Sequence, residues 1–343
     1  MEPKTGSYRS AGVDIDAAEA AKDEIATRVA ATHNVSVLRG VGHFGGFFRA
    51  PRSGGEVVLV SSADSVGTKV LVAALAKQHY PIGVDLVNHC VNDVLACGAR
   101  PLFFLDYYAT PKLDPNALRD IVQGMTDACA EAGCALIGGE TAQLPGIYQP
   151  GSYDLAGFIV GAVDESRIVD GSRIQNGDVI VRLPSVGLHT NGFTLARAAL
   201  ALDDRNVDPA LIDMLLVPHR SYLNDVAPLL DLDVIKGMAH ITGGGIAGNV
   251  SRIIPNGLVA EFDRAAWKPP RIFEIIQERG AISDEEMFKV FNMGIGFVMI
   301  VSPNDVDRVL DEIEDGTVVG RVISTLDRDK VRFIHSEDGQ VAS

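Results

Sequence analysis

The amino-acid sequence predicts an α/β protein with two domains, and three observations support this prediction. The chain has 343 residues, and domains average about 150 residues. In the first half, short apolar runs alternate with segments whose apolar residues recur at helical spacing. A polar stretch that contains two glycines, 164–178, precedes a second series of strands and helices. We therefore place the domain boundary in this stretch and expect domains of residues 1–168 and 169–343.

The first domain is predicted to alternate strands and helices. The strands are short apolar runs at 57–60, 102–105 and 135–137. Between the first two, apolar residues follow the i, i+3, i+4, i+7 spacing of a helix over 85–97, which Gly98 and Pro101 end. Between the second and third, Asp114 is expected to cap a helix with Pro115 in its first turn. Strands joined by helices in this way are typical of a parallel sheet.

The second domain is predicted to begin with a strand at 179–183. A turn and a helix from about Asn191 follow, and then a glycine-rich turn at 243–245 and a strand at 297–301. The last dozen residues are polar, so we expect them to be loosely held.

The charge balance excludes some classes of protein. The 30 basic and 45 acidic residues give a net charge of −15 and a pI near 4.9, whereas proteins that bind nucleic acids or anionic membranes usually present a basic face.

The N-terminus lacks the layout of a signal peptide, and no apolar run reaches the ~18 residues that span a bilayer. The four cysteines include no CxxC pair, as is typical of a reducing compartment. We expect a cytoplasmic protein that binds neither nucleic acid nor membrane.

Three acidic residues follow predicted strands of the first domain. They are Asp64, Asp106 and Glu140. The carboxyl ends of parallel strands meet at one edge of a sheet, where ligands bind in open α/β folds. Converging carboxylates repel one another unless a cation lies among them, and Mg²⁺ prefers oxygen ligands that it shares with phosphates. The sequence therefore predicts a magnesium site, with the alternative that each acid only caps the following helix or turn.

A polar stripe lies on the helix predicted at 85–97. Asp85, His89 and Asp93 are four residues apart, so they share one face. Histidine and aspartate at this spacing can bind a metal, but such a stripe is more often a solvated face, and His89 alone is more often structural.

Two glycine-containing segments of the first domain are compatible with phosphate binding. Gly67, Thr68 and Lys69 do not form a P-loop, because the second glycine of that motif is absent. Lys69 is still expected to neutralise a phosphate. The glycine-rich segment 40–46 is compatible either with a loop that closes over a ligand or with a plain hairpin.

Two turns of the second domain are predicted to bind anions. His189, Thr190 and Asn191 separate a strand from a helix, and the glycines at 243–245 occupy a similar position. Backbone N–H groups at a helix start point outward and favour negative charge. A single glycine turn before a helix is common in proteins that bind nothing there, so the pair of turns carries the prediction of a phosphorylated ligand.

Six segments of the sequence together resemble the phosphoribosylformylglycinamidine cyclo-ligase family, the aminoimidazole ribonucleotide synthetases of purine biosynthesis. They occur in the family's order and cover almost the whole chain. They are residues 8–16 (YRSAGVDID), 90–93 (CVND) with 98–108 (GARPLFFLDYY), 138–146 (GGETAQLPG), 187–193 (GLHTNGF), 239–245 (AHITGGG) and 291–296 (FNMGIG). Ser65 stands where the family commonly has glycine, and Gln143 where it usually has glutamate, so one acid of the family pattern is absent.

The resemblance implies the fold and the ligand sites. It implies an N-terminal ferredoxin-like or chorismate-mutase-like sheet that dimerises and binds ATP with Mg²⁺, and a C-terminal three-layer α/β/α domain that binds the substrate phosphate. The positions expected at ATP are Asp64, Gly67, Thr68, Lys69, Asp93, Asp106, Gly138, Gly139 and Glu140, of which Asp64, Asp106 and Glu140 are the expected metal ligands. Those expected at the substrate are His189, Thr190, Asn191, Gly243 and Gly244. Asp93 and His189 are the candidates for contacts at the reacting centre.

The resemblance also implies the reaction. ATP phosphorylates the formyl oxygen of formylglycinamidine ribonucleotide, an amidine nitrogen attacks that carbon, and phosphate leaves as the imidazole ring of 5-aminoimidazole ribonucleotide forms. Two alternatives remain open: another ATP-dependent enzyme of the superfamily, of the selenophosphate synthetase or thiamine-monophosphate kinase type, and a non-catalytic nucleotide-binding scaffold. The first cysteine, Cys90, lies inside a predicted helix, unlike the N-terminal reactive residue of selenophosphate synthetases, and the acids that a scaffold is expected to lose are all present.

Overall fold

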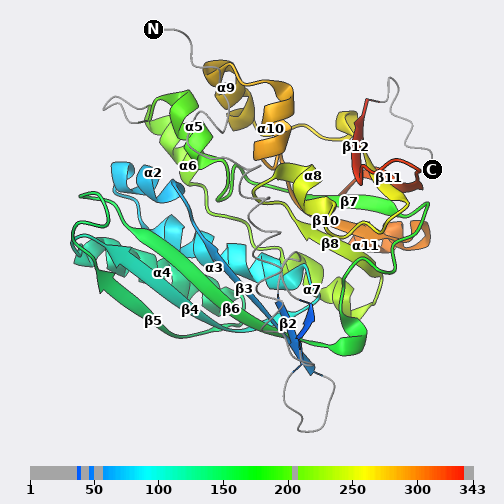
Figure 1. Cartoon of the computed structure of the whole chain (residues 1–343), viewed down its shortest axis with the longest axis horizontal. Helices are drawn as coiled ribbons and strands as arrows, with labels where there is room; N and C mark the ends of the chain where they lie inside the picture. Colours follow the sequence, from blue (N-terminus) through cyan, green and yellow to red (C-terminus); the bar gives the residue numbers. More distant parts are fainter. Residues whose placement is uncertain (1–36, 40–45, 50–56, 203–207, 336–343) are drawn as a thin grey trace.

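The computed structural model describes residues 37–39, 46–49, 57–202 and 208–335. These residues form two six-stranded sheets with helices packed against them (Figure 1). The opening segment 8–16 and residues 40–45 of the glycine-rich segment lie outside the described residues. Among the helices that are described, none is both long and apolar enough to cross a lipid bilayer.

The first sheet is built from residues 37–164. Its strands have the order β1-β2-β3-β6-β4-β5, and β4 and β5 are parallel while β6 is antiparallel to both of its neighbours. The strands are β1 (Val37–Arg39), β2 (Gly46–Arg49), β3 (Val57–Ser65), β4 (Arg100–Thr110), β5 (Ala135–Gln143) and β6 (Asp154–Asp164). The helices of this part are α2 (Lys69–Ala76), α3 (Tyr80–Leu95) and α4 (Pro115–Glu131).

The topology of this sheet differs from the ferredoxin-like arrangement. A ferredoxin-like unit has the element order βαββαβ. Here the helices occur between β3 and β4 and between β4 and β5, and β6 follows β5 directly. The last strand therefore lies in the middle of the sheet, between β3 and β4, and this makes the sheet mixed rather than parallel.

The predicted strand ends are wrong, and this changes the position of the three acids. Asp64, Asp106 and Glu140 lie inside β3, β4 and β5 instead of after them. The reason is pairing: β6 has 11 residues and hydrogen-bonds β3 as far as Ser65 and β4 as far as Ala109. Backbone pairing to a long neighbour continues a strand beyond its apolar part, so polar residues do not mark where it ends.

The second sheet is built from residues 179–334. Its order is β12-β9-β11-β7-β10-β8, with only the β12–β9 pair parallel. All seven residues of β10 are buried, so both faces of the sheet are covered, and Figure 1 shows α8 and α10 on one side and α7 and α11 on the other.

The strands of this sheet are β7 (Val179–Pro184), β8 (Ile235–His240), β9 (Leu258–Asp263), β10 (Ile295–Val301), β11 (Thr317–Ser324) and β12 (Val331–Ile334). The helices are α5 (Phe193–Leu200), α6 (Pro209–Leu216), α7 (Leu223–Asp231), α8 (Gly245–Val250), α9 (Arg271–Gly280), α10 (Asp284–Val290) and α11 (Val306–Glu312).

Helix α3 packs on both halves of the molecule. Its apolar side, with Leu86, Val87 and Cys90, is part of the core beneath the first sheet. Its polar stripe is also buried, with Asp85 0%, His89 2% and Asp93 6% exposed. The expectation of a solvated face is wrong, because residues 217–222 and β8 of the second half cover the stripe.

Two glycines let α3 approach α4 closely. A Cβ atom at Gly83 would overlap the backbone of Ile121 and Met125, and one at Gly124 would overlap the carbonyl oxygen of Tyr80. The two helix backbones are therefore in contact, and this contact fixes the position of α3 beneath the sheet.

We predict that Gly83→Ala and Gly124→Ala each destabilise the fold by about 1–3 kcal/mol, because an added methyl group must push two backbones apart. The measurement is the free energy of unfolding in urea. The matched control is Gly248→Ala in α8, where an added Cβ meets nothing within 4 Å; this change is expected to be neutral or slightly stabilising. Equal effects of all three substitutions would contradict the proposed close packing.

Candidate functional site at the domain junction

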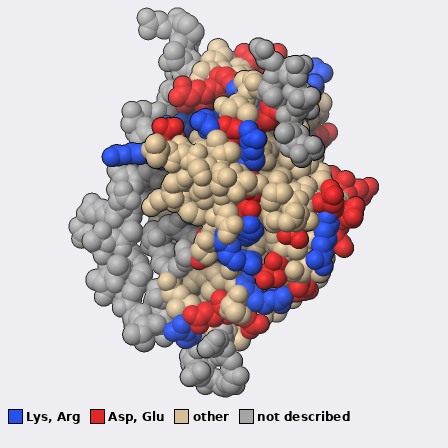
Figure 2. Space-filling view, turned by 90° about the vertical axis from the view of Figure 1, so that its right-hand side faces the viewer, with Lys and Arg blue, Asp and Glu red and all other residues tan. Residues whose placement is uncertain are grey.

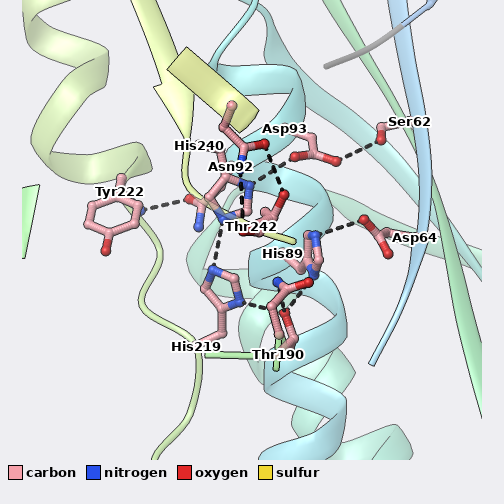
Figure 3. A network of polar contacts seen from close by, with 12 residues as sticks. Ser62, Asp64, His89, Asn92, Asp93, Thr190, His219, Tyr222, His240 and Thr242 are labelled. Carbon is pink, nitrogen blue, oxygen red and sulfur yellow. Dashed lines mark hydrogen bonds and ion pairs between the residues drawn. The ribbon is translucent and has the colours of Figure 1, made fainter. Parts of the chain in front are cut away.

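A continuous chain of polar contacts crosses the junction between the two halves (Figure 3). It runs from Asp64 on β3 to His89 on α3 (Oδ2–Nε2, 2.8 Å) and on to Thr190 (Nδ1–Oγ1, 2.8 Å). Thr190 contacts His219 (Oγ1–Nδ1, 3.3 Å), which in turn contacts His240 on β8 (Nε2–Nε2, 3.0 Å). The Nδ1 atom of His240 then lies 2.9 Å from Oδ1 of Asp93. Strand β3, helix α3, two loops and strand β8 are thus joined by side chains alone.

One contact of this chain is an ion pair rather than a hydrogen bond. Four contacts are hydrogen bonds, and the three imidazoles and one hydroxyl of the chain supply one hydrogen to each when neutral. The fifth contact, between His89 and the carboxylate of Asp64 (2.8 Å), is an ion pair when His89 carries an additional proton.

The electrostatics of the junction place this proton on His89. Burial alone would lower the pKa of His89, but Asp64, Asp93 and Asp85 raise it to about 9. Burial would raise the pKa of Asp64, but the charge and hydrogen bond of His89 outweigh this effect and lower it. Burial lowers the pKa of His240 despite its contact with Asp93. Burial and neighbouring positive charge together lower the pKa values of His189 and His219.

The polar stripe of α3 also holds the backbone of the loop that carries His219. Asn88 donates to the carbonyl oxygen of His219 (2.7 Å), and the backbone N–H of His219 donates to Asp85 (2.7 Å). Asn92 donates to the carbonyl oxygen of Arg220 (2.8 Å) and accepts from the N–H of Tyr222 (2.9 Å). These contacts fix the imidazole of His219 between Thr190 and His240.

Lys69 forms a fully buried ion pair instead of a solvent-facing site. Its Nζ atom lies 2.8 Å from Asp85, and it donates to the carbonyl oxygen of Val217 (2.9 Å). Both side chains are 0% exposed. Burial lowers the pKa of Lys69 and raises that of Asp85, and each partner opposes the shift of the other. In this structure the ammonium group neutralises a buried carboxylate.

The structure brings the predicted substrate turns together with part of the predicted ATP site. A Cβ atom at Gly243 would lie 3.2 Å from Oδ1 of Asn191, so the turn at 189–191 lies next to the turn at 243–245. From the first half, a Cβ atom at Gly67 would lie 3.9 Å from the carbonyl oxygen of Thr190. The hydroxyl of Thr68 is hydrogen-bonded to that of Thr194 at the start of α5 (2.9 Å).

His189 has an unusual conformation and an unused polar atom. Its φ is +61°, in the left-handed region that side chains rarely adopt. Its ring stacks on His219 with a centroid distance of 4.0 Å, and its Nε2 atom accepts from the N–H of Val186 (3.3 Å). Its Nδ1 atom is buried without a partner. A strained residue with a free buried donor is typical of a binding site rather than of a plain turn.

The three acids predicted to hold magnesium do not converge among the described residues. Asp64 and Asp106 both pair with Gly157 of β6, so they share a face but are two strand spacings, about 10 Å, apart. Glu140 pairs with Tyr107, the neighbour of Asp106, and therefore points to the opposite face. Gly138 and Gly139 accompany them on β5, and Gly139 lies against the carboxylate of Asp106. A single Mg²⁺ needs its ligands at 2.0–2.1 Å, so these three side chains do not form one magnesium site within this chain.

The surface in Figure 2 carries no continuous basic area. Basic and acidic side chains are interspersed on this face. Nucleic-acid-binding surfaces are usually dominated by basic side chains, and the described part of this face is not.

Comparisons with known proteins identify the family. Residues 37–163 match the family described as AIR synthase related protein, N-terminal domain, and residues 175–330 match its C-terminal domain. A phosphoribosylformylglycinamidine cyclo-ligase from Burkholderia mallei is 48% identical over 314 residues, which cover 90% of each chain. One from Bifidobacterium animalis is 45% identical and covers 90% of this chain and 92% of its own. The chain belongs to the phosphoribosylformylglycinamidine cyclo-ligase family. The resemblance predicted from the sequence is thereby confirmed, and so is the assignment to an enzyme class, the ligases.

Solved structures of more distant proteins share the fold. The HypE–HypF complex contains a chain with a TM-score of 0.65 and 19% identity, which covers 91% of this chain and 96% of its own. A thiamine monophosphate kinase from Aquifex aeolicus has a TM-score of 0.61 and 15% identity, with 91% and 95% coverage. At these identities the likeness concerns the two-domain α/β fold, which is as predicted.

The sequence reasoning missed several members of the site. His219, Ser62 and Asn88 drew no attention, and His240 was recognised only as part of a family motif. The sequence did contain a partial signal. Asn88 and Asn92 lie on the same helix face as the charged residues Asp85 and His89. A helix face with this many hydrogen-bonding and charged side chains is typical of an interface. Nothing in the sequence near His219 pointed to α3, because 130 residues separate His89 from it.

We predict that Lys69→Met destabilises the fold by about 3–5 kcal/mol, because it leaves Asp85 buried without its partner. Thermal unfolding measures this loss, and Lys77→Met, on the exposed end of α2, is the control expected to change little. If Lys69 acts mainly as a phosphate ligand, Lys69→Met should instead keep the melting temperature and raise the KM for ATP.

We predict a stability maximum near pH 6.5. The folded state binds the proton of His89 more tightly than the unfolded state, so this stabilisation is complete below 6.5 and is lost as the pH rises to about 9. His189, His219 and His240 have lowered pKa values and stay neutral when folded, so stability also falls as the pH drops below 6.5. Urea unfolding of wild type and His89→Gln checks the alkaline side: the advantage of wild type should shrink by on the order of 3 kcal/mol between pH 6.5 and 9. A constant difference across this range would contradict the assignment of the excess proton to His89.

Proposed function

We propose that this chain catalyses the ATP-dependent ring closure of formylglycinamidine ribonucleotide to 5-aminoimidazole ribonucleotide, with release of ADP and phosphate. Family membership over most of the chain is the observation that carries the proposal. Two solved structures of the same fold, a ThiL protein and a PurL protein from Thermotoga maritima, are complexes with the ATP analogue AMPPCP. These complexes support ATP as the cofactor of the reaction.

The junction suits the transfer of a phosphoryl group from ATP to a second phosphorylated ligand. The turn at Gly67 and Thr68 comes from the first half, and the turns at Thr190 and Gly243 come from the second half. We propose that ATP lies on the first of these and the ribonucleotide phosphate on the other two. Positioning of this kind converts a reaction between two bound molecules into an intramolecular one.

The side chains at the junction have separable tasks in this proposal. Asp64 is 39% exposed and is the one predicted metal ligand at the junction, so it would be the side chain that holds the divalent ion bound with ATP. Asp106 and Glu140 lie elsewhere on the sheet, and no step of the reaction is assigned to them. His189 is neutral and offers a free Nδ1 donor, which suits the negative charge that develops on the former formyl oxygen as its bond to carbon breaks and phosphate leaves. Asp93 is held by His240 and by Ser62 (2.9 Å) and orients the cluster from within.

We also propose that the chain forms a homodimer through the open face of its first sheet. Several large apolar side chains are exposed on its strands: Leu102 46%, Ile137 60% and Phe158 45%. Exposed apolar patches of this kind mark association surfaces.

The four cysteines are free and buried, which suits the reducing cytoplasm as the site of the reaction.

Light scattering at micromolar concentration should give about twice 36.5 kDa for the wild-type chain. Phe158→Glu should give a monomer, because it places a charge in the apolar contact. A wild-type chain that is monomeric and fully active would contradict the dimer.

The decisive experiment for the function is an ADP-release assay with and without formylglycinamidine ribonucleotide. We predict rapid ADP release only when this substrate is present, together with formation of the aminoimidazole product. Release of ADP with another phosphate acceptor, such as thiamine monophosphate, and none with formylglycinamidine ribonucleotide would move the chain to a kinase role.

His189→Ala tests the site within the same assay. It should lower the turnover by at least about tenfold, since loss of one preorganised donor costs this much or more, while the KM for ATP stays nearly unchanged. His79→Ala is a control, because His79 lies outside the junction and bonds Tyr153. Wild-type turnover of His189→Ala at every pH from about 6 to 9 would remove His189 from the reaction.

A further inference from the structure

We propose that Cys129 and Cys134 form a site of reversible oxidation, at which a hydroperoxide converts the two thiols into a disulfide. Cys129 lies in the last turn of α4, and Cys134 directly precedes β5, the edge strand of the first sheet. None of the residues given a task in the cyclisation belongs to this pair, so the inference does not rest on the proposed function.

The backbone at the end of α4 brings the two cysteines together. The helix ends in a Schellman motif, in which Gly133 has a φ of +63° and its N–H donates to the carbonyl oxygen of Ala130 (3.2 Å). The longer hydrogen bond of the motif runs from the N–H of Cys134 to the carbonyl oxygen of Cys129 (2.8 Å). The side chains at the two ends of this bond commonly touch, and here both are cysteines whose thiols are hydrogen-bonded to each other.

This geometry satisfies the main requirement of a disulfide. With standard bond lengths, the hydrogen bond between Cys134 and Cys129 holds their Cα atoms within about 6.7 Å of each other. Bridged cysteines have Cα atoms roughly 4.4–6.8 Å apart. The two thiols can therefore be joined without separating α4 from β5.

Cys134 is the thiol that meets the oxidant. It is 6% exposed whereas Cys129 is 2% exposed, and its chain neighbours Gly133 and Ala135 are both exposed. The S–H of Cys129 donates to Cys134, which lowers the pKa of Cys134 and raises that of Cys129. Because the thiolate is the nucleophile, Cys134 reacts first, and Cys129 waits beside it as the second thiol.

The other two cysteines are an internal reference. Cys90 and Cys97 are seven residues apart on and just after α3, which corresponds to about 10 Å along a helix, so they are too distant to bridge each other. Both are 0% exposed, and burial raises the pKa of the Cys90 thiol well above its usual value. We expect neither to react while the chain is folded.

The oxidation has two balanced steps. The thiolate of Cys134 attacks one oxygen of the hydroperoxide, the O–O bond breaks, the other oxygen leaves as an alcohol after taking up a proton, and a sulfenic acid forms. The thiol of Cys129 then attacks the sulfenic sulfur, the S–S bond forms and water leaves. Two thiols have lost two electrons and two protons, and the hydroperoxide has been reduced to an alcohol and water. A dithiol reverses the reaction by thiol–disulfide exchange.

Treatment of the intact wild-type chain with hydrogen peroxide tests the site without any substrate. With a few-fold molar excess at neutral pH, we expect two of the four free thiols, counted after unfolding, to be lost and then restored by a dithiol. Glu131 lies between the two cysteines, so cleavage after glutamate leaves two peptides that only the disulfide joins. A disulfide that includes Cys90 or Cys97, or four free thiols under conditions that oxidise free cysteine, would overturn the proposal.

Variants assign the two roles. Cys129→Ser should accumulate a sulfenic acid at Cys134, which dimedone traps, whereas Cys134→Ser should leave Cys129 as a free thiol. Cys97→Ser is the matched control and should form the disulfide like wild type. Serine is close in size to cysteine, and the peptide mapping of the wild-type chain stands even if one variant fails to fold. Absence of the sulfenic acid in Cys129→Ser, or loss of the disulfide in Cys97→Ser, would refute the site.

Discussion

The junction depends on the burial of a charged helix face. Asp85, His89 and Asp93 lie on α3 beneath the second half of the molecule, and an unpaired charge in such a place costs several kcal/mol. Lys69, His240 and the backbone of residues 217–222 supply the partners. Lys69 belongs to α2 of the first half but also donates to the carbonyl oxygen of Val217, and the other partners belong to the second half. Pairing these charges therefore holds the second half against α3 and brings the site residues together.

Much of the fold was predictable from the sequence because apolar spacing is a local signal. The helices at α3 and α4 and the central parts of β3, β4 and β5 appeared in their correct order, and the cap at Asp114 is formed, with its side chain accepting from the N–H groups of Asn116 and Ala117. The strand ends were not predictable in this way. Pairing with β6 continues β3 past Asp64, and β6 lies about 90 residues further along the chain.

The site was predictable only where its residues lie in motifs. Thr190, Asn191 and Gly243 adjoin as expected, since both turns precede helices of the same domain. Asp106 and Glu140 were expected beside Asp64 because strand ends of a parallel sheet share an edge, but an antiparallel strand between β3 and β4 separates them, and strand alternation turns Glu140 away. The joining of these residues into one chain of contacts was not predictable, because its members come from five separate segments that only the packing of the two halves brings together.

The polar character of the junction has a thermodynamic consequence. Separation of two apolar surfaces raises the heat capacity, whereas hydration of polar groups lowers it. Opening at α3 would expose carboxylates, imidazoles and amides more than aliphatic side chains. A motion that opens only this junction would therefore have a small or negative heat-capacity change, and calorimetry would separate it from loss of either apolar core, for which the change is large and positive.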